Sequence, residues 1–325
     1  MSFLEKAKQY TGSDLDQIFF RPMLTGPTAA ELGVRILYNL PTPTTVQLWD
    51  GQRNILQQYN AAGWTGGAPA TKYQKTIDLK RVKAELGFSA ADYFSLVYEK
   101  IAARADVNMD DLTGSELEQA ETALFKQAVA ENIRATMWVG DSAAAIGYNT
   151  FDGFLKTINA GVPKEAFYNM FYQRTDLEDP EKVVEIFDDL WTSSPARLQD
   201  LKADGQLVFF VTADLYHRYE KYLDAKGAEA AYSGCVNGRE GLAYHGIPVV
   251  DVRLSNYLTA TSYHQSFCLL TDRRNLVLAV NTADFPGNEV RMWYNPDEME
   301  NRQRALFMAG CDILDETLIA YAYRQ

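Results

Sequence analysis

The chain has 325 residues and 47% hydrophobic residues, enough for one elaborate domain or two ordinary ones with a buried core. Its formal net charge of −12 argues against a protein that grips nucleic acid, because such a protein must neutralise phosphates. Three widely spaced cysteines, no apolar run of membrane-spanning length and no signal-peptide pattern argue against a disulfide framework, a membrane protein and secretion, so we expect synthesis in the cytoplasm.

Residues 1–45 predict an irregular N-terminal arm. Prolines recur there, and proline removes a backbone donor and keeps the preceding residue extended. The arm nevertheless carries apolar side chains, among them Phe19 and Phe20, which need cover. We expect the arm to lie against a neighbouring surface, either of its own subunit or of another.

Residues 46–86 predict a long β-hairpin. Residues 46–49, which end in Trp49, start the first strand. Residues 75–83 alternate for part of the second strand, and Trp64 lies in a glycine-rich tip at 63–69. An isolated two-stranded ribbon is marginally stable in water. An exposed tryptophan is also a liability unless a partner covers it. We therefore expect this ribbon to lie on another surface.

Two helices are predicted next, at 88–104 and at 113–139. The second is the longest helical pattern of the chain, with apolar residues at helical spacing and no glycine or proline before Gly140. At 1.5 Å per residue such a helix spans roughly 37 Å. It is therefore a rod as well as a core element.

The rest of the chain predicts a mixture of helices and strands. We expect a short helix at 151–158, helical structure at 180–202 with Pro180 in the first turn, a buried strand at 207–211 and a helix at 214–226. Further strands are expected at 247–252, at 267–270 and 276–280 as a hairpin turned by 271–275, at 289–294, and at 312–323.

No catalytic, cofactor or metal site is predicted. The G-x-S-x-G, Walker A and G-x-G-x-x-G motifs are absent, and His217, His245 and His264 lie in no catalytic context. Asp106–Asp110 resembles the start of a calcium loop, but the glycine and glutamate that such a loop requires are replaced by Asp111 and Leu117.

Two other features have surface or core interpretations. The carboxylates Asp188, Asp189, Glu298 and Glu300 are expected on solvated faces. For Tyr216, Tyr219 and Tyr222, spaced along one helix, core packing and an interface stay equally open.

The order of the segments resembles the major capsid proteins of tailed bacteriophages, which have the HK97-like fold. The match is collinear over nearly the whole chain. Segments similar to those of the family are Thr150–Leu155 after the long helix, Val208–Tyr216, Tyr244–Val250 and Thr271–Leu276.

The resemblance implies an α+β fold with five parts. These are an N-terminal arm (1–45), an extended loop (46–86), a peripheral domain (87–195) with a spine helix at 113–139, an axial domain (196–265), and a return to the peripheral sheet (266–325).

The function that the resemblance implies is a structural one. Copies would form hexamers and pentamers of an icosahedral head enclosing double-stranded DNA, in a virion assembled in the host cytoplasm. A portal, scaffold or decoration protein is a candidate further partner. Phe19, Phe20, Trp49 and Trp64 are the candidate inter-subunit contacts. An encapsulin-like nanocompartment shell, an enzyme with a scattered site and a non-assembling α+β binding module stay open as alternatives.

Overall fold

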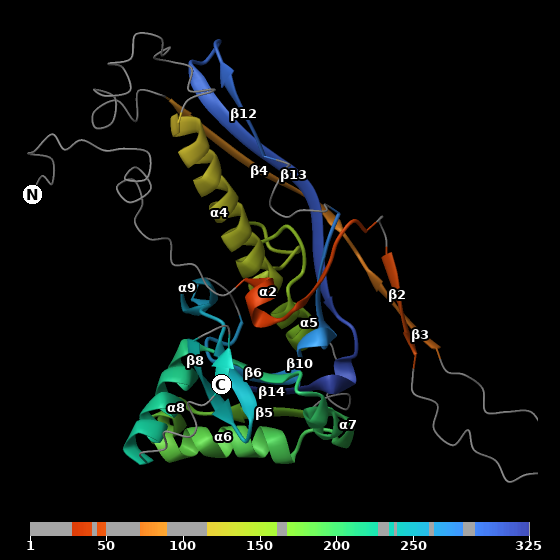
Figure 1. Cartoon of the computed structure of the whole chain (residues 1–325), viewed down its shortest axis with the longest axis vertical. Coiled ribbons are helices and arrows are strands. Elements are labelled where there is room, and N and C mark those ends of the chain that lie inside the picture. Colours follow the sequence, from red (N-terminus) through yellow and green to blue (C-terminus); the bar gives the residue numbers. More distant parts are fainter. Residues whose placement is uncertain are drawn as a thin grey trace, which may run out of the picture.

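The computed structural model describes residues 28–40, 44–49, 72–89, 116–160, 168–226, 234–236, 239–259, 263–281 and 290–324. Two sheets and a long helix share one hydrophobic core, and a two-stranded ribbon extends from this body (Figure 1). The predicted α+β class is confirmed.

The five-stranded sheet is organised around one long strand, β13 (Glu300–Ile313). Ala305, Phe307 and Ala309 of this strand are buried, whereas the residues between them are more exposed. The sheet therefore has a covered face and an open face. Strands β4 (Lys80–Ser89), β12 (Val290–Asn295) and β11 (Leu276–Val280) pair antiparallel with β13, and β1 (Arg35–Leu37), preceded by helix α2 (Ala29–Leu32), pairs parallel with β11.

Helix α4 (Glu116–Val139) lies along the covered face of this sheet (Figure 1). Phe125, Val129 and Ile133 are buried at intervals of four residues, which places them on one side of the helix. The predicted spine helix is confirmed from residue 116 onward, and residues 113–115 lie outside the described part of the chain.

The junction between α4 and α5 (Phe154–Ala160) depends on two glycines. The Gly153 amide donates to the Gly140 carbonyl at 2.8 Å. A Cβ atom on Gly153 would lie 2.6 Å from the Gly140 nitrogen, and one on Gly140 would lie 2.3 Å from the Phe151 carbonyl oxygen. Both residues must therefore lack a side chain for the two helices to meet here.

The seven-stranded sheet is covered on both faces. Phe209 packs edge-to-face on Phe187 of α6 (Pro180–Thr192), with ring centroids 5.2 Å apart. Phe210, the next residue, packs on Trp138 of α4 at 5.5 Å. The strands of the seven-stranded sheet lie in the order β5 (Tyr168–Tyr172), β14 (Ile319–Arg324), β10 (Phe267–Asp272), β6 (Leu207–Val211), β9 (Ile247–Asp251), β8 (Arg239–Tyr244) and β7 (Gly234–Val236).

Three more helices belong to this part of the molecule. Helix α8 (Ala213–Lys226) covers the sheet beside α6 (Figure 1). Helix α7 (Ala196–Asp200) follows α6, and α9 (Ser255–Leu258) follows β9. The predicted strand at 207–211, the helix after it and the first-turn position of Pro180 are all confirmed.

The ribbon is shorter than predicted. Strands β2 (Thr44–Trp49) and β3 (Lys72–Ile77) pair antiparallel, but the chain then bends at Asp78–Leu79, and β4 pairs with β13 over its whole length. Ile77 and Leu79 are buried, so they draw the chain into the body at this bend. The structure therefore confines the hairpin to residues 44–77 and assigns residues 80–86 to the five-stranded sheet.

The predicted helix at 88–104 begins too early. Phe88 and Ser89 continue strand β4 opposite Asn301 and Glu300 of β13. Residues 90–104 lie outside the described part of the chain.

The predicted hairpin of residues 267–270 and 276–280 is wrong. Strand β10 pairs with β6 and β14, whereas β11 pairs with β13 and β1, so the turn between them passes from one sheet to the other. Asn275 fixes this turn because its side chain donates to the Asp315 carbonyl at 2.9 Å and accepts from the Asp315 amide at 2.8 Å.

The strand pairing also changes the assignment of two predicted segments. Strands β10 and β14 pair with the block predicted as axial, and the predicted strand at 312–323 is interrupted between β13 and β14. The division of the chain into arm, loop, peripheral and axial domains stays a prediction.

Candidate functional site

The β2–β3 hairpin extends away from the two sheets (Figure 1). Its strands pair from Thr44–Ile77 to Trp49–Lys72, and the Thr45 and Thr76 hydroxyls lie 3.4 Å apart. Two strands offer little core of their own, so the hairpin depends on what holds its base.

The base of the hairpin, here called the root, is buried in the body. Ile77 and Leu79 pack with Val277 and Ala279 of β11 in a small separate cluster. Gly310 of β13, which pairs with Ala279, comes so close to the bend that a Cβ atom there would lie 2.4 Å from the Asp78 carbonyl oxygen. The root therefore has a fixed position on the sheet.

An ion pair network adds to the root. The Lys75 ammonium of β3 lies 3.0 Å from a Glu316 carboxylate oxygen and 3.5 Å from one of Asp312. Burial would lower the pKa of Lys75, but its hydrogen bond to Glu316 and the two negative charges outweigh burial and raise it. Burial raises the pKa of Asp312, against the opposing effect of Lys75. Lys75 therefore stays charged, and its ion pairs link β3 to the end of β13.

The open face of the five-stranded sheet carries large apolar side chains. Trp293 of β12 is 40% exposed and Leu306 of β13 is 44% exposed. Arg302 lies directly opposite Trp293, on the same face as Leu306, and pairs with Glu298 and Glu300. Apolar side chains with paired charges beside them form a surface that suits contact with another molecule.

The four candidate contact residues are not brought together by described contacts. Trp49 ends β2 opposite Lys72, and Phe19, Phe20 and Trp64 lie outside the described residues. Their roles stay predictions. The sequence interpretation missed the root and the open face, because both depend on β13, which it did not predict.

The histidines occupy three separate places. His217 is exposed on α8 beside Glu220 at 3.3 Å, and His245 forms a turn with a φ of 47°. His264 stacks on Tyr323 with ring centroids 3.9 Å apart, and burial lowers its pKa. The surface and turn positions predicted for His217 and His245 are confirmed.

The tyrosines of α8 serve the core. Tyr219 is buried, its hydroxyl donates to the Ala243 carbonyl at 2.9 Å, and burial raises its pKa to about 12. Tyr216 and Tyr222 are partly buried against the same cluster. The core interpretation is therefore the one that the structure supports.

The carboxylates Asp188, Asp189 and Glu298 are exposed, as predicted, and Glu300 is partly exposed. Glu298 and Glu300 pair with Arg302, and Asp188 accepts from the Tyr244 hydroxyl at 3.1 Å. Within the described ranges no group of three or more His, Cys, Asp or Glu side chains is placed to hold a metal ion, and no helix there is long and apolar enough to cross a membrane. The Asp106–Asp110 segment lies outside these ranges.

Comparison with solved structures finds the same fold in viral shells. The capsid of Myoviridae phage XM1 matches with a TM-score of 0.60 and 13% identity, over 98% of this chain and 97% of that chain. The capsid of an empty GTA particle matches with a TM-score of 0.57 and 14% identity, over 98% and 94%. A satellite phage P4 procapsid matches with a TM-score of 0.56 and 12% identity, over 100% and 94%.

These matches extend over whole chains, so this chain has the HK97-like fold of tailed-phage capsid proteins. At 11–14% identity the likeness concerns the fold alone. No protein-family model and no curated protein matches the sequence.

Proposed function

We propose that this chain is the major shell protein of a tailed phage or prophage. Its copies assemble into hexamers and pentamers of an icosahedral head that encloses double-stranded DNA. The observation that carries the proposal is the end-to-end likeness to capsid chains. The protein acts through its geometry, as a structural component without catalysis.

The form of the molecule supports this proposal independently. The hairpin extends from the body on a root that is fixed by Ile77, Leu79 and Lys75. A ribbon held in this way is directed outward, where it lies on a neighbouring copy. Many modest contacts of this kind, repeated in a closed lattice, give collective stability far beyond that of a single pair.

The negative charge of the chain agrees with a container for DNA. A wall with a net charge of −12 per copy repels phosphates and lets the enclosed polyanion move. DNA is thus enclosed without sequence-specific binding. Phe19, Phe20, Trp49 and Trp64 contribute apolar contacts between copies, and a portal, scaffold or decoration protein joins the shell as a separate chain.

Negative-stain electron microscopy of the expressed chain tests the proposal. Closed particles of uniform size are the expected result, and a chain that stays monomeric at high concentration would contradict it. Particles that enclose a protein cargo instead of DNA would favour a nanocompartment shell over a phage head.

A deletion tests the part played by the extended loop. Removing residues 55–72, including Trp64, should abolish closed particles while the body still folds. The matched control replaces the same residues with a Gly/Ser linker of equal length, which restores the connection but not the side chains. Normal shells from the deleted chain would remove the loop from the assembly contacts.

A further inference from the structure

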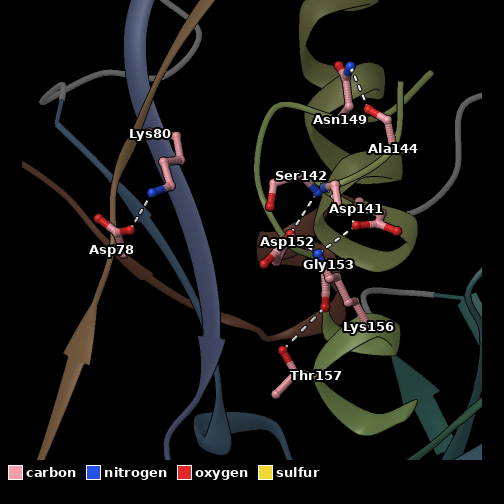
Figure 2. Close-up of polar contacts among 12 residues, drawn as sticks. Asp78, Lys80, Asp141, Ser142, Ala144, Asn149, Asp152, Gly153, Lys156 and Thr157 are labelled. Carbon is pink, nitrogen blue, oxygen red and sulfur yellow. Dashed lines mark hydrogen bonds and ion pairs between the residues drawn. The ribbon is translucent and has the colours of Figure 1, made fainter. Parts of the chain in front are cut away.

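The loop of residues 141–150, between α4 and α5, has a shape fixed by its own hydrogen bonds. The Asp141 amide donates to the Tyr148 carbonyl at 2.9 Å, and the Ala144 amide donates to the Asp141 carbonyl at 3.0 Å. The Asn149 side chain donates to the Ala144 carbonyl at 3.2 Å (Figure 2). These bonds close the loop on itself.

Two carboxylates and one lysine hold the ends of the loop together (Figure 2). Asp152 accepts from the Ser142 amide at 2.7 Å, and Asp141 accepts from the Ala143 amide at 2.9 Å. The Lys156 ammonium donates to Asp141 at 2.5 Å and to Asp152 at 2.8 Å. The charges of this segment are therefore paired at its base.

The base of the loop is also fixed to the body. Tyr148 packs edge-to-face on Tyr257 of α9, with ring centroids 5.4 Å apart. The Cys311 thiol of β13 lies 3.0 Å from the Asp152 carbonyl oxygen, within reach to donate to it. The loop is thus held from α9 on one side and from β13 on another.

The outer part of the loop is apolar and uncharged. Ile146 is 90% exposed, the most exposed of the large hydrophobic side chains that the structure describes. Ala143, Ala145 and Gly147 are exposed beside it, and residues 142–149 include no lysine, arginine, histidine, aspartate or glutamate. An isoleucine held out in water by a rigid loop gains nothing from its own subunit.

We propose that the 141–150 loop is a contact site for a second copy of this chain, which covers Ile146. This inference rests on the proposed shell function. Copies that each carry a charge of −12 repel one another, so an uncharged apolar protrusion is a favourable place for them to touch. Because the loop is already ordered, binding costs little conformational entropy.

The position of the loop supports the same partner. Lys80, just after the hairpin root, is near enough to Asp152 for their charges to interact, and Figure 2 shows both beside β13. The loop therefore borders the root from which the hairpin extends toward a neighbour.

Ile146→Asp tests the contact. The side chain is almost fully exposed, so thermal unfolding of the unassembled chain should not change. The concentration at which half of the chain is assembled, measured by light scattering, should rise by about tenfold or more, because an apolar contact is replaced by an uncompensated charge. Met299→Asp is the matched control, since Met299 is also exposed and lies in the turn between β12 and β13.

Thiol labelling gives a second readout that does not depend on stability. In Ile146→Cys, a maleimide should modify residue 146 in the free chain at least tenfold faster than in assembled particles. Lys156→Met, which loosens the loop but keeps Ile146, should raise the assembly concentration by a smaller factor.

Two outcomes separate this inference from the shell function. Unchanged assembly of Ile146→Asp, or equal labelling of residue 146 in free chain and particles, would overturn the loop contact and leave the shell standing. Failure of the unmodified chain to assemble would overturn both.

Discussion

The two sheets of this protein use the same kind of strand in different ways. In the seven-stranded sheet, Phe209 packs on α6 and Phe210 packs on α4, so both faces are covered within one chain. In the five-stranded sheet, Phe307 packs inward while its neighbour Leu306 remains 44% exposed. One sheet completes its core alone, and the other leaves a face and a hairpin available to other molecules.

This difference indicates that different parts of the chain determine folding stability and assembly. Substitutions in the seven-stranded sheet should act on folding, and substitutions on the open face, the hairpin or the 141–150 loop should act on contacts between copies.

The largest effect is expected for Phe210→Ala. The side chain is fully buried against Trp138, so its loss should lower the free energy of unfolding by about 3–5 kcal/mol. Leu306→Ala, on the open face, should change it by less than about 0.5 kcal/mol. Urea denaturation of the unassembled chain measures the free energy of unfolding of both variants. Similar losses of stability would contradict the difference inferred between the two sheets.

Gly153→Ala should have the next largest effect. The new Cβ atom would lie 2.6 Å from the Gly140 nitrogen and 2.7 Å from the Thr136 carbonyl oxygen, which are backbone atoms that cannot move independently. We expect a loss of about 1–3 kcal/mol. Gly87→Ala in β4 is the matched control, because the nearest atom there is a Glu300 side-chain oxygen at 3.4 Å. Gly153→Ala should unfold at a clearly lower temperature than Gly87→Ala.

Lys75→Met should have a smaller effect, at the root of the hairpin. It removes the partner of Glu316 and Asp312 from a half-buried site, at a cost of about 0.5–1 kcal/mol. Limited proteolysis should show faster cleavage of the hairpin while the body remains intact. Lys83→Met, which removes an exposed pair with Glu85, is the control and should not change the cleavage rate.

The smallest effect is expected from acidification of the 141–150 loop. The hydrogen bond from Lys156 lowers the pKa of Asp141 below its ordinary value. For Asp152, burial raises the pKa, but hydrogen bonds from Lys156 and Ser142 outweigh burial and lower it. A lowered pKa means that the unfolded chain binds more protons, so this stabilisation is complete above about pH 5 and is lost progressively as the pH falls below about 4.

Stability measured between pH 6 and pH 3 checks this prediction. Asp152→Asn should reduce the pH dependence of the free energy of unfolding relative to the unmodified chain. An unchanged slope would mean that the carboxylates contribute equally in the folded and unfolded states.

Local patterns were sufficient for several elements. Apolar residues at helical spacing without glycine or proline predicted α4, and a dense apolar run predicted β6. The order of the segments indicated the fold through its resemblance to a known family, before any strand pairing was available.

Strand β13 shows where local patterns failed. Its inward positions include Asn301 and Gln303, which are buried although polar, so the alternation of apolar residues that marks a strand is hidden. Without β13, neither the end of the hairpin nor the open face of the sheet was predictable.

The sequence by itself determined the spine helix α4, the buried strand β6 and the helix that follows it. Only the tertiary structure decided that β10 and β11 join different sheets, that Gly153 must meet Gly140, and that Ile146 faces water. The physical reason is that periodicity reports whether a side chain is buried, whereas the partner that buries it is chosen by contacts between residues far apart in the chain.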